Sequence, residues 1–327
     1  MNSVILQNNG DLKVSILYLV IPCHNEEKCI PETAKQLSAK LSSMIKKEIC
    51  SKESKILFID NGSNDQTWSL IVDLFNKNDL ICGLKLTNNF GHQNALLAGL
   101  ITVKEFADCI ISMDADLQDD IEVIDQFLDK YHNGCEIVYG VRKKRETDTF
   151  FKRNTALLFY KLMKALGADI VYNHADYRLL SRNAVNALAE YKEVNLFLRG
   201  IIPLIGYKTD IVYYDRNPRF AGESKYPFRK MLSFAMDGIT SFSVKPLKMI
   251  SNFGILISCL SILALIFALI CKLLRISAPG WFGIVVSIWL LGGVQLFCIG
   301  VLGEYIGKIF KEAKQRPRFH IDIFLKK

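Results

Sequence analysis

The sequence predicts an α/β protein with a mostly parallel sheet, followed by a C-terminal third that associates with a membrane. Three observations support this prediction: apolar runs alternate with segments of helical periodicity through residues 14–166, polar side chains follow the end of almost every run, and two long hydrophobic stretches follow residue 250. Alternating strands and helices are typical of a parallel sheet with helices on both faces. We therefore expect a strand-and-helix domain first and a membrane-associated part after it.

The expected strands are short, apolar and rich in β-branched residues. They lead directly into turn residues or acids, as where Asp60 is followed by Asn61 and Gly62. The segments between them repeat apolar residues at helical spacing. The predicted strands are residues 14–21, 55–60, 81–86, 109–113 and 136–140, and the predicted helices are about residues 31–47, 66–75, 94–104, 121–131 and 149–166.

The composition limits the kinds of partner and compartment. The chain has 327 residues, 50% of them hydrophobic, and a net charge of +8. The positive charge is clustered around the hydrophobic C-terminal third, which favours anionic lipid headgroups over nucleic acid. None of the nine cysteines forms a Cys-x-x-Cys pair, which indicates reduced, inert thiols on the cytosolic side.

One apolar run, which begins at Cys109, stops abruptly at an acidic segment. On an extended segment Asp114, Asp116 and Gln118 point to the same side, and two carboxylates with an amide oxygen suit Mg²⁺ or Mn²⁺. The alternative is a strand followed by an acidic helix cap. Because the other polar candidates also follow strand ends, we favour a metal that holds a diphosphate. No Gly-x-Gly pattern occurs, which argues against a dinucleotide oxidoreductase.

The two hydrophobic stretches, residues 253–274 and 281–303, each contain about 20 residues, enough to cross a bilayer. Basic residues are frequent before and after the pair, whereas the connection offers only Lys272 and Arg275. The positive-inside rule then places both the first domain and the tail in the cytoplasm. The alternative, a buried hairpin in a soluble core, suits two such stretches in tandem poorly. Residues 228–247 have the mixed composition of helices at a membrane surface.

With these motifs in order, the chain resembles the family 2 inverting glycosyltransferases of the polyprenyl-phosphate type, which include bactoprenol glucosyltransferases and dolichyl-phosphate mannose synthases. The resemblance covers nearly the whole chain. It depends on Val20-Ile-Pro-Cys-His-Asn-Glu-Glu27, Ile59-Asp-Asn-Gly-Ser-Asn-Asp65, Asn89-Phe-Gly-His-Gln93, Ala98-Gly-Leu100, Asp114-Ala-Asp-Leu-Gln118, Ala175-Asp-Tyr-Arg-Leu-Leu-Ser181 and Phe220-Ala-Gly-Glu-Ser-Lys-Tyr226.

The resemblance implies a division of the chain into four parts. Residues 1–215 are expected to form a cytoplasmic Rossmann-like GT-A catalytic domain, and residues 216–249 an acceptor loop with juxtamembrane amphipathic helices. Residues 250–304 are expected to form a two-helix transmembrane hairpin, and residues 305–327 a basic cytoplasmic tail. The protein would then be a multi-pass protein of the plasma (inner) membrane.

The resemblance also assigns roles to single residues. It implies that Asp114, Asp116 and Gln118 bind the metal, with Asp116 and Asp176 as the catalytic residues, and that Asp176 orients the nucleophile or acts as a base. The nucleotide sugar is expected to contact Pro22, Asn25, Glu26, Asp60 and Asp114. One departure is Asn61, where the family often has a second Asp. Asp119 and Asp120 also depart from the family, and we expect them to cap the following helix.

An acceptor phosphate needs cations, and guanidinium groups match phosphate oxygens. The residues expected to hold it are Arg142, Arg153, Arg219, Ser224 and Lys225. For each cation the alternative is a solvated basic face. The histidines His24, His92 and His174 lie in motif loops, and we expect hydrogen bonding there because their neighbours do not form a zinc-binding pattern.

The function we predict is transfer of a hexose, with glucose from UDP-glucose favoured, onto undecaprenyl phosphate for cell-envelope glycosylation, with Mg²⁺ or Mn²⁺ as cofactor. An alternative is the same reaction with UDP-N-acetylglucosamine or GDP-mannose. A processive polysaccharide synthase is disfavoured because no Gln-x-x-Arg-Trp motif occurs. An alternative of another class is a catalytically inactive membrane scaffold, and the resemblance suggests a homo-oligomer.

Overall fold

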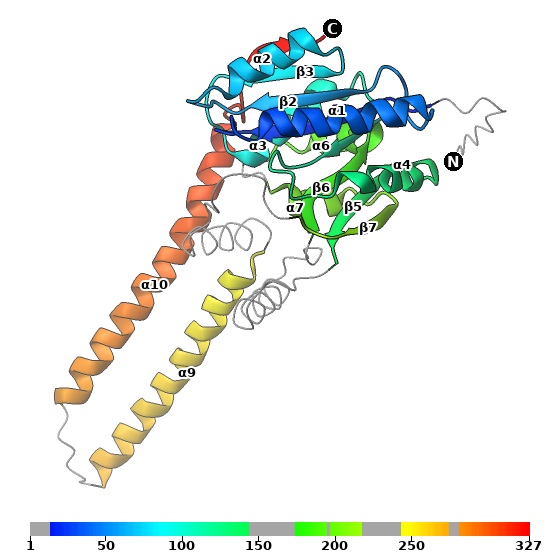
Figure 1. Ribbon diagram of the computed structural model, residues 1–327. Helices are drawn as coiled ribbons and strands as arrows, with labels where there is room; N and C mark the ends of the chain where they lie inside the picture. Colours follow the sequence, from blue (N-terminus) through cyan, green and yellow to red (C-terminus); the bar gives the residue numbers. More distant parts are fainter. Residues whose placement is uncertain (1–13, 144–173, 195–196, 218–242, 275–280) are drawn as a thin grey trace. The chain divides into compact units, whose positions relative to one another are not determined.

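The computed structural model describes residues 14–143, 174–194, 197–217, 243–274 and 281–327 (Figure 1). The chain divides into two compact units. The first contains Met1–Arg153, Val171–Lys225 and Pro317–Lys327, and the second contains Asn154–Ile170 and Tyr226–Arg316. The first unit therefore includes the C-terminal end of the chain.

A mixed sheet organises the first unit. Within the described residues it has eight strands in the order β7-β5-β6-β4-β1-β2-β3-β8. Strand β1 pairs in parallel with β2 and β4, β2 with β3, and β5 with β7. The expected α/β domain with a mostly parallel sheet is confirmed. The strands are β1 (Leu17–Cys23), β2 (Lys55–Asp60), β3 (Ile81–Leu86), β4 (Cys109–Ser112), β5 (Ile137–Arg142), β6 (His174–Ser181), β7 (Thr209–Tyr214) and β8 (Ile321–Leu325).

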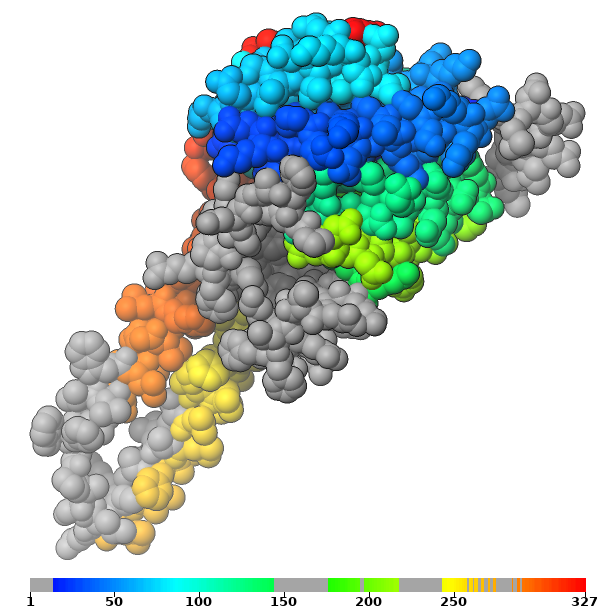
Figure 2. Space-filling view, viewed as in Figure 1, coloured from blue at the N-terminus to red at the C-terminus, as the bar shows by residue number. Residues whose placement is uncertain are grey.

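Three of these strands were not expected. Strand β6 lies between β4 and β5 and is antiparallel to both. Strand β7 forms one edge of the sheet, and β8 forms the other edge, antiparallel to β3. Figure 2 shows the red C-terminal segment beside the light-blue and cyan part of the chain. The expectation of a basic tail over residues 305–327 therefore needs correction, because residues 321–325 form a strand of this sheet.

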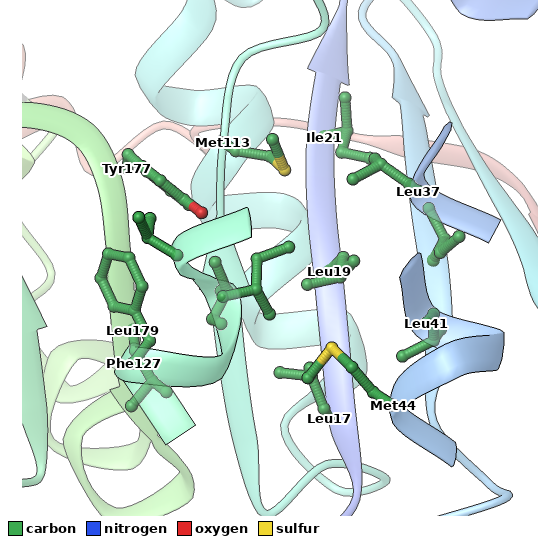
Figure 3. Packing of buried hydrophobic residues seen from close by; sticks show 14 of the residues in the cluster. Leu17, Leu19, Ile21, Leu37, Leu41, Met44, Met113, Phe127, Tyr177 and Leu179 are labelled. Atoms are coloured by element: carbon green, nitrogen blue, oxygen red, sulfur yellow. The ribbon is translucent and has the colours of Figure 1, made fainter. Parts of the chain in front are cut away.

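Helices cover both faces of the sheet. On one face, Leu17, Leu19 and Ile21 of β1 pack against Leu37 and Leu41 of α1 (Figure 3). Helices α1 and α2 are neighbours on the surface of that face (Figure 2). The helices of the first unit are α1 (Ile30–Lys46), α2 (Thr67–Lys77), α3 (His92–Val103), η1 (Ile121–Val123), α4 (Ile124–His132), α6 (Arg182–Glu190) and α7 (Leu198–Leu204).

Helix α3 packs closely on the other face because Gly99 has no side chain. A Cβ at Gly99 would lie 2.3 Å from Cδ1 of Ile59 and 2.7 Å from Cγ1 of Val20. This close packing fixes the beginning of α3 near the ends of β1 and β2. The predicted helices before residue 132 agree with the structure to within about two residues, as is usual for helix ends. The predicted helix over residues 149–166 lies outside the described residues.

The second unit contains the long helices α9 (Lys245–Leu273) and α10 (Trp281–Lys314). They expose large apolar side chains such as Leu256 at 54% and Phe297 at 69%. Among the described residues, one helical stretch, Leu290–Lys314, is long and apolar enough to cross a membrane. A second crossing therefore stays a prediction.

Candidate active site

The candidate site lies at the carboxyl ends of β1, β2 and β4, where parallel α/β sheets bind ligands. The strands are in register there, because Cys23 is opposite Asp60 and Val20 is opposite Ser112. The ends of these strands and the loops that follow them carry the predicted nucleotide-sugar and metal residues. The ends of these strands therefore bring together segments that are distant in the sequence.

Neutral hydrogen bonds join the loops after β1, β2 and β3. The Nδ1–H of His24 donates to the carbonyl of Asn61 at 3.0 Å, and the Nδ2 of Asn89 donates to Nε2 of His24 at 3.0 Å. The side chain of Asn61 donates to Oδ1 of Asn89 at 3.1 Å and accepts from the amide of Phe90 at 3.0 Å. An Asp at position 61 could accept but not donate, so the departure from the family motif has a local reason. For His24 the predicted hydrogen-bonding role is confirmed.

The same loops approach each other backbone to backbone at Gly62. Its φ is +63°, and a Cβ there would lie 2.5 Å from the backbone of both Asn88 and Asn89. Asn25 also has a left-handed φ of 55°, and its amide donates to Oγ of Ser63 at 3.0 Å. Strained backbone of this kind is common at functional sites and requires strong support from its surroundings.

Asp60 has an unused oxygen at the centre of this arrangement. The residue is 1% exposed, and its Oδ1 accepts from the amide of Ser63 at 3.1 Å. Within the described part of the chain its Oδ2 is buried without a hydrogen-bond partner. Buried polar atoms are nearly always satisfied, so this oxygen suits a donor from a ligand such as a ribose or a base. Pro22 is buried opposite Ile59.

Glu26 is held in the same loop by its backbone. Its amide donates to Oγ1 of Thr67 at 2.9 Å, at the beginning of α2. Of the predicted nucleotide-sugar residues, Pro22 and Asp60 therefore lie at the carboxyl ends of β1 and β2, and Asn25 and Glu26 lie in the loop after β1.

The acidic motif follows β4 but is not a simple extension of it. Strand β4 ends at Ser112, and Leu117 has a left-handed φ of 57°. The side chain of Asp116 accepts from the amide of Gln118 at 3.2 Å across this turn. The expectation of one extended segment from Asp114 to Gln118 is therefore wrong, and a turn determines where Gln118 lies.

Electrostatics at Asp114 suit a divalent cation. Burial raises the pKa of Asp114 to about 6, and the carboxylates of Asp119, Asp176 and Asp116 add to this, against an opposing effect of His92. A cation relieves such repulsion. Among the described residues no three Asp, Glu, His or Cys side chains gather as a metal site. The predicted set, with two carboxylates and one amide oxygen, fits a metal that a diphosphate helps to hold.

Asp176 is surrounded by cations. Nε and Nη2 of Arg199 lie 3.2 and 3.1 Å from its two oxygens, Arg178 donates to Oδ1, and Nε2 of His92 lies 3.5 Å from Oδ2. Burial alone would raise the pKa of Asp176, but Arg199 and Arg178 hold it well below its usual range. His92 also lies 3.7 Å from Asp114. These cations favour the anionic form of Asp176.

Arg199 was not identified from the sequence. It is a single arginine on the short helix α7 and belongs to no motif. A hydrogen bond joins the beginning of α7 to α3, because Oε1 of Gln93 accepts from the amide of Leu198 at 2.9 Å. Arg199 is the next residue on α7. Only this tertiary contact could have pointed to Arg199.

Arg142 was expected to hold the acceptor phosphate, but in the structure its guanidinium contacts Asp119 and Tyr214. Its Nη2 lies 3.3 Å from Oδ1 of Asp119, and its Nε donates to the hydroxyl of Tyr214 at 3.2 Å. That hydroxyl in turn donates to Asp119 at 2.5 Å. Asp119 thus pairs with Arg142 instead of capping a helix, whereas Asp120 caps η1 as expected by accepting from the amide of Glu122 at 2.9 Å.

Gln118 is contacted by the segment that follows β7. Nη2 of Arg216 donates to Oε1 of Gln118, and the amide of Asn217 donates to the carbonyl of Gln118 at 3.0 Å. Neither residue was predicted to lie in the site. The remaining predicted acceptor residues, Arg153, Arg219, Ser224 and Lys225, lie outside the described residues.

The acidic motif and Asp60 lie at the carboxyl ends of parallel strands, where α/β sheets bind ligands. Residues 18–189 match the family model described as glycosyl transferase family 2. The chain therefore belongs to this family of glycosyltransferases, and the expected Rossmann-like GT-A type of catalytic domain is confirmed.

Curated relatives match over nearly their whole length. The chain is 54% identical to the uncharacterised glycosyltransferase YkoT of Bacillus subtilis (strain 168), over 95% of this chain and 92% of that protein. It is 40% identical to the bactoprenol glucosyl transferase of Shigella phage SfX, over 93% of this chain and 97% of that protein. It is 37% identical to the uncharacterised glycosyltransferase sll0501 of Synechocystis, over 93% of each chain.

Proposed function

We propose that this protein transfers a hexose from a nucleotide sugar, with UDP-glucose favoured, to a polyprenyl phosphate such as undecaprenyl phosphate. The observation that carries the proposal is the 40% identity to a bactoprenol glucosyl transferase along 93% of the chain. Inversion of an α-linked donor would give a polyprenyl-phosphate β-sugar. The arrangement of the site supports this reaction in the following ways.

On the donor side, Asp60 offers the nucleotide its buried Oδ2, which has no hydrogen-bond partner among the described residues. Asp114, Asp116 and Gln118 would hold Mg²⁺ or Mn²⁺ with the diphosphate. Such an ion stabilises the negative charge that develops on a leaving diphosphate, and no proton transfer is needed. The hydrogen bonds among His24, Asn61 and Asn89 hold the loops after β1, β2 and β3 in place before substrate arrives.

On the acceptor side, Asp176 acts by position. An acceptor phosphate monoester has a second pKa of about 6, so it is largely ionised at pH 7 and needs little help from a base. Asp176 is held as an anion by Arg199 and Arg178, which is consistent with a positioning role. We assign the acceptor phosphate to Arg153, Arg219, Ser224 and Lys225. For Arg142, whose guanidinium contacts Asp119, we infer that it orients the acidic segment.

The path of the chain is consistent with a membrane hairpin whose two ends lie on the same side. Strand β8 belongs to the same sheet as β1, although α9 and α10 lie between them in the sequence. The number of membrane crossings between the two is therefore even. Two crossings, by α9 and α10, satisfy this requirement and match the exposed apolar side chains of both helices.

The test is transfer of labelled sugar to undecaprenyl phosphate by the purified full-length protein. UDP-glucose, UDP-N-acetylglucosamine and GDP-mannose are supplied separately, each with Mn²⁺ or with EDTA. We expect metal-dependent label in the lipid phase, with the highest rate from UDP-glucose. A higher rate from another donor would change the sugar assignment only, whereas no lipid product from any donor, with folded protein and verified acceptor, would overturn the reaction.

A further inference from the structure

The contact between Arg216 and Gln118 joins two parts of the site that have separate tasks. Gln118 belongs to the predicted metal set, and Arg216 is the first residue of the expected acceptor segment, residues 216–249. Nη2 of Arg216 donates to Oε1 of Gln118, the same oxygen that a cation would use. We propose that Arg216 is a positioning residue that holds this oxygen in the metal-free protein and releases it when the cation and the diphosphate bind.

The local structure makes this exchange feasible. A backbone bond from the amide of Asn217 to the carbonyl of Gln118, at 3.0 Å, keeps Arg216 beside the motif while its side chain moves. The turn at Leu117 and the bond from the amide of Gln118 to Asp116 fix the backbone of the motif. Only side chains need to rearrange, and Arg216 is exposed.

The exchange has a consequence for the order of events. The guanidinium of Arg216 would leave Gln118 only when the cation and its diphosphate bind. The beginning of the acceptor segment then senses whether the donor is loaded. This inference depends on the proposed function, because it assumes that Gln118 binds the metal of a nucleotide sugar.

If Arg216 and Mn²⁺ compete for Oε1 of Gln118, removing Arg216 should change the Kd for Mn²⁺ in a predictable direction. If Arg216 has to release Oε1 before a cation binds, Arg216→Ala should bind Mn²⁺ more tightly than the wild type. A charge-assisted hydrogen bond of ordinary strength corresponds to a decrease of about threefold to tenfold in the Kd for Mn²⁺. If Arg216 instead helped to hold the metal and its diphosphate, the same variant would bind Mn²⁺ more weakly.

The experiment measures free Mn²⁺ by electron paramagnetic resonance with the full-length protein, in the presence of UDP or of GDP. Lys143→Ala is the control, because it removes an exposed positive charge directly after β5. We expect a Kd for Mn²⁺ within about twofold of wild type for this control, since exposed charges are screened. Equal tightening in Lys143→Ala and Arg216→Ala would overturn the proposal, because the effect would then be general electrostatics.

A double variant shows whether Arg216 acts through Gln118. In a Gln118→Ala background, Arg216→Ala should no longer tighten Mn²⁺ binding, since the contested oxygen is gone. Persistent tightening would overturn the proposal. Unchanged or weaker binding in the single Arg216→Ala variant would overturn this inference alone, whereas wild-type protein that binds no Mn²⁺ with either nucleotide would overturn the metal assignment of the proposed function as well.

Discussion

The two halves of the site are held together by different forces. In the half that we call neutral, residues 24–26, 60–63 and 88–91, the hydrogen bonds that join the loops are made by uncharged amides and a histidine, although Glu26 and Asp60 also belong to this half. In the charged half, residues 92, 114–119, 176, 178, 199 and 216, carboxylates alternate with cations. A lattice of neutral bonds positions a ligand, whereas clustered charges change when a cation or phosphate enters. Variants in the charged half should therefore change kcat, and variants in the neutral half should change KM.

The largest effect is expected for Asp116→Ala in the charged half. Loss of a metal-binding carboxylate should reduce kcat/KM by about 10³-fold or more, because charge on the leaving diphosphate is no longer stabilised. The measurement is the rate of sugar transfer at saturating Mn²⁺. Asp73→Ala, which removes an exposed acid on α2, is the control and should retain activity. Unchanged activity of Asp116→Ala would show that the metal assignment is wrong.

A second prediction concerns Arg199, which holds both oxygens of Asp176. Arg199→Ala should lower kcat by about 10-fold to 100-fold, because a misplaced group near the reacting atoms is costly. The pKa of Asp176 should also rise, since a major cation that lowers it is gone, so the acid side of the pH–rate profile moves to higher pH. Arg182→Ala breaks another Arg–Asp pair, with Asp108, and should leave the profile unchanged. A fall in kcat with no shift of the profile would indicate a structural role only.

In the neutral half we expect a smaller effect, on the KM for the nucleotide sugar. Asn61→Asp restores the residue that the family often has but removes the donor to Oδ1 of Asn89. We expect the KM for the nucleotide sugar to rise about threefold to tenfold with kcat nearly unchanged, as for the loss of one hydrogen bond. Asn64→Asp, at an exposed neighbouring position, is the control. A drop in kcat with constant KM would remove the distinction between the two halves.

The smallest effect concerns stability in EDTA. The folded-state pKa of Asp114 is about 6, above the ordinary value of 3.8, so its contribution to stability is present below pH 4 and is lost as the pH rises through 6. Asp114→Asn should therefore raise the melting temperature above pH 6 by about 1–3 °C, allowing for solvent screening of a side chain that is 40% exposed. Near pH 4 the difference should vanish. A lower melting temperature for Asp114→Asn at pH 8 would contradict this account.

Much of the neutral half could be predicted from the sequence. Strands β1 and β2 are nearly continuous apolar runs that end in turn residues, so their parallel pairing and the position of Asp60 follow from local pattern and from the geometry of α/β sheets. The core on the side of α1 follows in the same way from helical spacing. Local signals suffice where neighbouring strands are close in the sequence.

The charged half could be predicted only in part. The acidic motif is visible, but its side chains contact Arg142 at the end of β5 and Arg216 after β7, and Asp176 of β6 contacts Arg199 of α7, all across long sequence separations. Strand β8 has five residues and follows a long helix, so no local pattern indicates that it joins the sheet beside β3. Arg199 and Arg216 are single residues outside any periodic pattern, and only tertiary structure shows which carboxylate or amide each contacts.

The most direct test of the account is the identity of the product. Full-length protein is incubated with undecaprenyl phosphate and UDP-glucose, with and without Mn²⁺, and the lipid fraction is analysed by mass spectrometry and NMR. The account predicts one hexose added to the lipid phosphate, in the β configuration, only when the metal is present. An α-linked product would contradict inversion, and formation of hexosyl lipid phosphate without any metal would contradict the role assigned to Asp114, Asp116 and Gln118.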